Sequence, residues 1–223
     1  MKENLWKWLG GILILYSIFA GLLIRVPDLP VIHESIRNLF YHVCMWFAMI
    51  VVMAVSFVNS LRFLRTFNLR YDTLAAEAAR TGLLFGFLGI LTGMVWARFT
   101  WGDFWVKDPQ LNGAAVTILI YLAYLVLRSS IDEEQKRARI SAVYAIFAFV
   151  LLIVFIGILP RLSEGSIHPG KGGNPGLGVN GLDSTMRLVF YPAIAGWVIT
   201  GIIIWRIRVR LVQLKSRIDE LND

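Results

Sequence analysis

The 223-residue sequence is poor in two kinds of residue, cysteine and charged residues. Cys44 is the only cysteine, so the chain has no intrachain disulfide, no zinc site built from paired cysteines and no Cys-x-x-Cys-His site for covalent cofactor attachment. Charged residues make up 17%, against about 25% in ordinary soluble domains. Hydrophobic residues reach 57% and the mean hydropathy is +0.64. This composition is typical of an integral membrane protein.

Apolar runs near the ~20 residues that cross a bilayer as a helix occur six times in the chain. The expected spans are residues 5–24, 43–61, 81–95, 113–127, 140–159 and 188–205. The sequence thus predicts an all-α bundle of six transmembrane helices, forming a single membrane domain over residues 1–223, with both termini on one side. In the third span four glycines share one helix face, which predicts close packing against a neighbouring helix. They are Gly82, Gly86, Gly89 and Gly93.

The distribution of Lys and Arg predicts the orientation, because positive residues near span ends favour the cytoplasm. Of the 22 Lys and Arg residues, fifteen fall on the side of the two termini. The other seven are Arg25, Arg37, Arg98, Lys107, Arg161, Lys171 and Arg187. We therefore expect cytoplasmic termini, with a Trp-rich loop at 96–112 and a Gly/Pro-rich loop at 161–187 outside. The net charge of +7 follows from this bias and from contact with anionic lipid, so it does not predict nucleic-acid binding.

Familiar catalytic patterns are missing from the sequence. It has no His-Glu-x-x-His motif, no paired carboxylates within the expected spans and no Ser/His/Asp set on one side, so we do not expect an enzyme of the hydrolytic kind. The expected spans contain almost no ionisable residue, although ion-coupled transporters usually place some there. Any chemistry is therefore expected at the outer surface.

Aromatic residues are concentrated between the third and fourth expected spans. Five of them fall within ten positions, more than the one or two rings that an interfacial anchor needs. They are Trp96, Phe99, Trp101, Phe104 and Trp105. This density predicts a surface for a flat ligand.

All three histidines lie on the same predicted outer side, at His33, His42 and His168. His42 marks the outer end of the second span and His168 precedes the sixth, so the two can approach a ligand resting on the Trp-rich segment. Haem suits these groups, since a porphyrin packs against Trp rings, its iron accepts His nitrogen and its propionates accept hydrogen bonds from cations. We therefore predict non-covalent haem with His42 and His168 as the two axial ligands. The candidate propionate partners are Arg37, Arg98 and Lys107.

The stretch Trp101-Gly-Asp-Phe-Trp105-Val-Lys-Asp108-Pro-Gln-Leu111 resembles the tryptophan-rich signature of the haem-handling proteins of cytochrome c assembly. That signature reads Trp-Gly-x-x-Trp-x-Trp-Asp, with a Leu a few residues on. Three further stretches, together with the six spans, are similar to the CcmC branch of this superfamily. They are Thr92-Gly93-Met-Val-Trp96, Tyr41-His42-Val43 and Ile167-His168-x-Gly170.

The resemblance implies His42 and His168 as axial haem ligands, and a haem platform made by Trp101, Gly102, Trp105 and Asp108. Trp96 is a further candidate for this platform, with a plain interfacial ring as the alternative. It also implies a task, which is to hold haem at the outer face of a bacterial inner membrane and pass it to the haem chaperone CcmE. The implied neighbours are the bilayer and the CcmA and CcmB transporter subunits. The chain departs from the usual pattern where Lys107 replaces the third Trp, Gln110 replaces an Arg and Cys44 replaces a Pro.

Two other functions stay open on the sequence. The chain could be a permease subunit that carries haem or another small molecule through the bilayer, although the scarcity of polar residues in the spans argues against this. It could also be a compact cytochrome c synthase that attaches haem itself. That branch shares the Trp motif but usually has more spans and more histidines.

Overall fold

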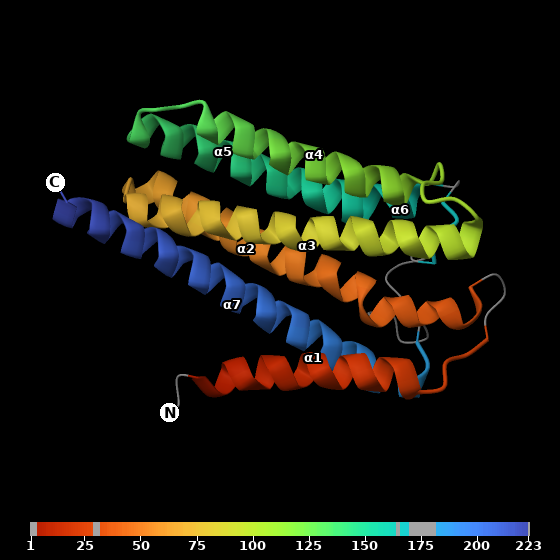
Figure 1. The fold of residues 1–223 in the computed structure, drawn as a ribbon. Helices are drawn as coiled ribbons and strands as arrows, with labels where there is room; N and C mark the ends of the chain where they lie inside the picture. Colours follow the sequence, from red (N-terminus) through yellow and green to blue (C-terminus); the bar gives the residue numbers. More distant parts are fainter. Residues whose placement is uncertain (1–3, 29–31, 164–165, 170–181, 223) are drawn as a thin grey trace.

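The computed structural model describes residues 4–28, 32–163, 166–169 and 182–222, whose long helices run side by side (Figure 1). In chain order the elements are α1 (Leu5–Leu23), the 3-10 helix η2 (His33–Phe40), α2 (His42–Thr66), α3 (Leu69–Trp101), α4 (Pro109–Ser129), α5 (Glu134–Leu152), the π-helix η3 (Ile153–Ile158), α6 (Leu159–Leu162) and α7 (Ser184–Asn222). Six helical segments in these described ranges are long and apolar enough to cross a membrane. For the described residues, the prediction of an all-helical fold with six helices of membrane length is confirmed.

The boundary between the third and fourth spans differs from the sequence prediction. α3 continues to Trp101 and α4 begins at Pro109, so the loop predicted at 96–112 is reduced to residues 102–108. No glycine or proline interrupts residues 94–101, and the helix ends only at Gly102, whose φ of 91° is left-handed. Trp96 and Trp101 therefore lie on a helix rather than on a loop. Most of the predicted loop 161–187 falls outside the described residues.

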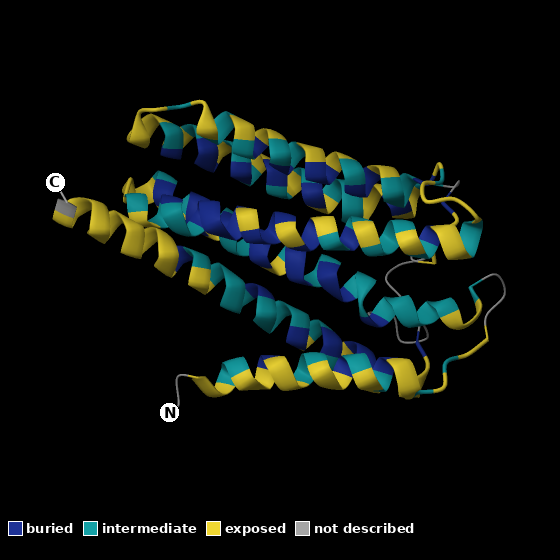
Figure 2. Cartoon of the chain, in the orientation of Figure 1, coloured by how far each residue is buried: buried dark blue, intermediate teal, exposed yellow. Residues whose placement is uncertain are grey.

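The central pair of the bundle is α2 and α3, with α4 and α5 packed beside them as a second pair (Figure 1). α7 crosses the central pair obliquely and contacts α1 on its other side. Both chain termini lie at the same end of the bundle. Buried residues concentrate on α2 and α3, whereas α1 exposes most of its side chains (Figure 2). The exposed apolar side chains of the outer helices suit contact with lipid.

The predicted glycine face of α3 is the surface that contacts α2. A Cβ atom on any of its four glycines would approach a side chain of α2 to within 2.9 Å, which is closer than van der Waals contact. The facing pairs are Gly82 with Met53, Gly86 with Met49, Gly89 with Trp46 and Gly93 with His42. The expectation of close helix packing is confirmed, and the packing ends at His42.

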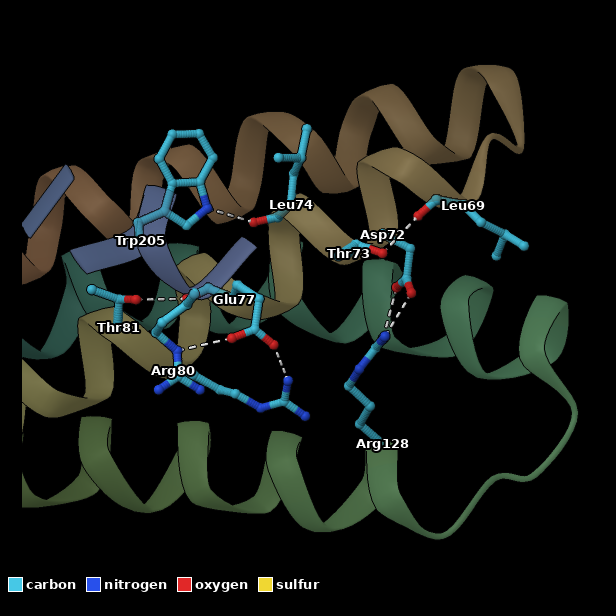
Figure 3. Close-up of polar contacts among 10 residues, drawn as sticks. Leu69, Asp72, Thr73, Leu74, Glu77, Arg80, Thr81, Arg128 and Trp205 are labelled. Carbon is cyan, nitrogen blue, oxygen red and sulfur yellow. Dashed lines mark hydrogen bonds and ion pairs between the residues drawn. The ribbon is translucent and has the colours of Figure 1, made fainter. Parts of the chain in front are cut away.

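Two buried carboxylates of α3 join the helices at the end of the bundle where the termini lie (Figure 3). Asp72 accepts two hydrogen bonds from the Arg128 guanidinium of α4, at 2.7 and 2.5 Å. Glu77 pairs with Arg80 of its own helix and with Arg208 of α7, the latter at 2.8 Å. Removing one partner of the buried Asp72–Arg128 pair is expected to cost about 3–5 kcal/mol, whereas the Arg208 side chain is partly exposed. The two contacts hold α4 and α7 against α3.

The fifth span changes helix type towards its end. α5 passes into the π-helix η3, a wider turn than an α-helix, and then into the short α6. α4 approaches η3 closely at Gly113, where a Cβ atom would collide with the carbonyl oxygen of Phe155. This contact brings η3 to the same end of the bundle as Trp101, where the candidate site lies.

Candidate functional site

A cavity of about 420 Å³ lies at the end of the bundle where α3 ends. This volume falls in the range of about 300–1,000 Å³ that small-molecule sites occupy. The walls come from η2, α2, α3, α4, η3, α6 and the stretch that carries His168, and most of the lining side chains are apolar. Both His42 and His168 line the cavity, together with Trp96 and Trp105. Two imidazoles from distant parts of the sequence thus face one cavity.

His42 is the first residue of α2, and packing against α3 sets its position. Its Nδ1 lies 3.1 Å from the Thr92 hydroxyl oxygen. The ring of Trp46 meets the imidazole edge-on, with 6.3 Å between the ring centroids. A Cβ atom at Gly93 would lie 2.7 Å from the imidazole Cε1, so the ring occupies space that only glycine leaves.

His168 lies against two tryptophans of the last turns of α3. Its ring centroid is 5.9 Å from that of Trp96 and 6.3 Å from that of Trp101, and the two indoles are themselves 4.9 Å apart at a steep angle. Burial lowers the pKa of His168 below its ordinary value, while the nearby Asp108 carboxylate acts in the opposite direction. The imidazole is therefore neutral at neutral pH, the state in which it can bind iron.

The indole of Trp96 also ties η2 to α3. Its N–H points at Ser35, lying 3.1 Å from the carbonyl oxygen and 3.0 Å from the hydroxyl oxygen. Ser35 itself lines the cavity. Trp96 therefore forms part of the cavity wall on α3 and, through Ser35, holds the adjacent wall formed by η2.

Asp108 connects the start of α4 with the stretch that carries His168. The side chain is fully buried, and its Oδ1 caps α4 by accepting the Gln110 N–H at 2.7 Å. Its Oδ2 accepts from the Ser166 hydroxyl at 2.9 Å and from the Ile167 N–H at 2.8 Å. The His168 N–H in turn donates to the Ser166 hydroxyl at 3.3 Å. One carboxylate thus positions the backbone on which His168 lies.

The other predicted platform residues surround this arrangement without all lining the cavity. Trp105 lines it with 40% of its surface exposed, and its N–H donates to Asn112 at 3.2 Å. Trp101 contacts the rings of Trp96 and His168 but is not among the residues that line the cavity. Gly102 has the left-handed backbone conformation that ends α3. The structure therefore brings all seven predicted site residues to one end of the bundle, in different roles.

Three predicted propionate partners are engaged elsewhere or lie outside the cavity lining. Arg37 donates to the carbonyl oxygens of Gly21 and Ile24, at 3.0 and 2.6 Å, and so caps α1. Arg98 lies over the ring of Phe104, 5.9 Å from its centroid. Lys107 is exposed and is not among the residues that line the cavity.

Sequence reasoning missed the cation that does line the cavity, which is Arg161. It lies in α6, just after the π turn, and within the described ranges it makes no hydrogen bond or ion pair. Gln110, which replaces the Arg usual in the resembling proteins, lines the same cavity. Only the nearness of Arg161 to His168 in the sequence hinted at this position.

The family described as "CcmC: Heme exporter protein C" matches residues 2–158, well over half of the chain. The chain belongs to the CcmC family. The matched residues include His42 and the segment from Trp96 to Asp108, and they end before Arg161 and His168. The resemblance seen in the sequence is therefore confirmed for the family.

Individual relatives of this CcmC-family chain have two kinds of name. "Heme exporter protein C" of Bradyrhizobium diazoefficiens is 31% identical over 121 residues, which is 53% of this chain and 45% of the relative. "Cytochrome c biogenesis protein CcsA" of Prochlorococcus marinus is 37% identical over 87 residues, or 39% of this chain and 27% of the relative. The CcsA of Pelargonium hortorum is 32% identical over 110 residues, or 48% and 34%. The chain thus covers less than half the length of these relatives.

The contacts of Asp108 lead to a first prediction. In an Asp108→Ser variant the hydroxyl can still cap α4, but it offers no second oxygen to Ser166 and Ile167. Hydrogen bonds to a charged group contribute about 1.5–3 kcal/mol, so the Ile167 amide should exchange with solvent ~10- to 100-fold faster. Hydrogen–deuterium exchange of the peptide covering residues 166–169 measures this change.

Asn68→Ser is the matched control, because Asn68 caps α3 at the other end of the bundle by accepting the Arg70 N–H at 2.9 Å. That variant should leave exchange at Ile167 unchanged. Equal exchange at Ile167 in the Asp108→Ser protein and the parent would refute the positioning role of Asp108.

Proposed function

We propose that this chain is a haem-binding protein of cytochrome c maturation, which holds haem at the outer face of a bacterial inner membrane and delivers it to a haem chaperone. The observation that carries the proposal is the single cavity lined by both His42 and His168. Membership of the CcmC family and the names of its relatives, heme exporter protein C and cytochrome c biogenesis protein, support the same reading.

The residues of the cavity fit haem in their chemistry. No group of three or more His, Cys, Asp or Glu side chains that could hold a bare metal ion occurs in the part of the chain that the structure describes. Two imidazoles alone suit an iron whose other ligands come from a porphyrin, and the mostly apolar wall with Trp96 and Trp105 suits the porphyrin face. Haem, when bound, would supply the iron, and His42 and His168 are the residues that would hold it.

Arg161 provides the charge that the propionates of haem require. A guanidinium can form two charge-assisted hydrogen bonds with one carboxylate, and among the described residues no other Lys or Arg lines the cavity. Arg161 can therefore bind a propionate as an ion pair, which the uncharged amide of Gln110 cannot do. Lys107 occupies the position of the usual third Trp of the motif. Trp105 is therefore the exposed aromatic ring at the edge of the cavity.

The proposed orientation rests on the excess of Lys and Arg at the end of the bundle that carries the termini. Both termini then lie in the cytoplasm, and the cavity opens towards the periplasm. The proposed partners follow from this location and from the family. They are the haem chaperone CcmE on the outer side and the CcmA and CcmB subunits in and below the membrane.

The axial ligands can be tested in the purified protein. His42→Ala and His168→Ala should each remove one imidazole from the iron and abolish the low-spin, two-imidazole absorption spectrum of the haem-loaded protein. Haem titration followed by visible spectroscopy measures both the spectrum and the affinity. A parental spectrum in both variants, at normal protein level, would refute the proposed site.

Arg161→Gln distinguishes loss of a charge from loss of an iron ligand. It should keep the two-imidazole spectrum but weaken haem binding about tenfold or more, as expected for losing a charge-assisted bond of about 1.5–3 kcal/mol. Haem dimethyl ester, which lacks both carboxylates, should bind the variant and the parent equally. Equal affinity of both proteins for haem itself would exclude Arg161 as the propionate partner.

Delivery is expected to depend on Trp105, the most exposed ring of the lining. Trp105→Ala leaves both histidines in place, so the variant should retain haem. It should nevertheless transfer less haem to purified CcmE, and it should lower the yield of c-type cytochrome in cells that depend on this chain. Phe99→Ala, which removes an exposed ring outside the cavity lining, is the control. Normal maturation with Trp105→Ala would reopen the permease reading.

The orientation has its own test by cysteine labelling in a Cys44→Ser background. A single cysteine in place of Asp103 should react with an impermeant thiol reagent added outside intact cells or spheroplasts. A cysteine in place of Glu133 should react only after the membrane is permeabilised. The opposite pattern would place the cavity on the cytoplasmic side.

A further inference from the structure

The Thr92 hydroxyl lies beside one ring nitrogen of His42 and within hydrogen-bond distance of two backbone carbonyls. The Thr92 oxygen lies 2.8 Å from the carbonyl oxygen of Leu88, 3.1 Å from that of Gly89 and 3.1 Å from His42 Nδ1. A hydroxyl carries one proton and two lone pairs. Both carbonyls can only accept, so they compete for that proton.

The proton goes to the backbone, because a helical Thr commonly donates to the carbonyl four residues earlier and the Leu88 contact is the shortest of the three. The Thr92 oxygen is then an acceptor towards His42, which requires a proton on Nδ1.

A neutral imidazole has one N–H, so a proton on Nδ1 leaves Nε2 with a free lone pair. The ring has little room to turn over, since Cε1 lies only 2.7 Å from the place that a Cβ atom of Gly93 would occupy and Trp46 meets the ring edge-on. These contacts favour the Nδ1–H tautomer and one orientation of the His42 ring before any ligand is bound. Outer hydrogen bonds of this kind orient metal-binding histidines in general.

We infer that Thr92 is a positioning residue, which fixes His42 as the Nδ1–H tautomer and presents Nε2 to the haem iron. The inference rests on the proposed function, in that His42 has to be an axial ligand. Without the Thr92 oxygen the imidazole can move its proton to Nε2, and that tautomer cannot bind iron through Nε2. Thr92 acts only through His42 and does not contact the iron.

The tautomer can be read in the haem-free full-length protein by nitrogen NMR with ¹⁵N-labelled histidine in detergent. The chain has three histidines, and the signals of His42 are those missing from the His42→Ala variant. In the parent, Nδ1 should show the shift of a protonated nitrogen and Nε2 that of an unprotonated one. The reverse assignment in the parent protein would overturn the inference without any substitution at Thr92.

Thr92→Val keeps the shape of the side chain but removes the oxygen. It should shift the His42 tautomers towards Nε2–H and weaken haem binding by ~10- to 100-fold, the usual effect of losing an outer partner of a metal ligand. Thr92→Ser retains the hydroxyl and should behave like the parent, which also serves as the folded reference if the valine variant is unstable. Unchanged tautomers and affinity in a folded Thr92→Val protein would refute the role of Thr92.

Thr81→Val is the matched control, because Thr81 lies on the same helix and donates to the carbonyl four residues earlier, that of Glu77, at 2.7 Å (Figure 3). Thr81 is far from His42 along α3, so this variant should retain the parental tautomer and affinity. The outcomes separate the two proposals. A parental spectrum in His42→Ala refutes the ligand assignment, whereas loss of that spectrum in His42→Ala combined with a parental Thr92→Val refutes only the positioning role.

Discussion

The close contact between α2 and α3 determines where the other elements lie. Four glycines of α3 remove the side chains that would separate the two helices, and large residues of α2 occupy the space. The contact runs from Met53 in the middle of the bundle to His42 at its end. A helix pair packed at this distance is rigid, so the imidazole at its end has a fixed position. The remaining walls of the cavity are arranged around that fixed point.

The two histidines are held by different kinds of force. The place of His42 is set by helix packing, which extends over several turns, and one hydrogen-bond contact with Thr92 adds to it. His168 depends on a few hydrogen bonds that converge on Asp108, and on its contacts with Trp96 and Trp101. Because Asp108 also caps α4, the start of that helix and the backbone next to His168 are stabilised by the same carboxylate. A change at this one residue therefore reaches two parts of the site.

The sequence was sufficient to predict the elements whose signal is local. Apolar runs of membrane length predicted six spans, and the glycine spacing predicted a packing face. The end of α3 was misplaced because the aromatic and charged residues around Trp96 look like a loop, while contacts with Ser35 and His168 stabilise them on a helix. The partners of Asp108 lie 58 and 59 residues further along the chain, so no local pattern indicates them. Arg161 was missed because counting the Lys and Arg residues on each side of the membrane does not show which of them lines a cavity.

The π-helix η3 changes the directions in which the side chains after it point. Each residue of an α-helix rotates the next by about 100°, and a π turn fits an additional residue into the turn. α5 buries the face that carries Ala148 and Leu152. The additional residue in η3 rotates the positions after it, and in α6 Pro160 is buried while Arg161 lines the cavity. Deletion of one residue between 153 and 158 should rotate the following turn and bring a neighbouring residue, instead of Arg161, to the cavity wall. We therefore expect the site to be more sensitive to a change of length in residues 153–158 than to a change of side chain there.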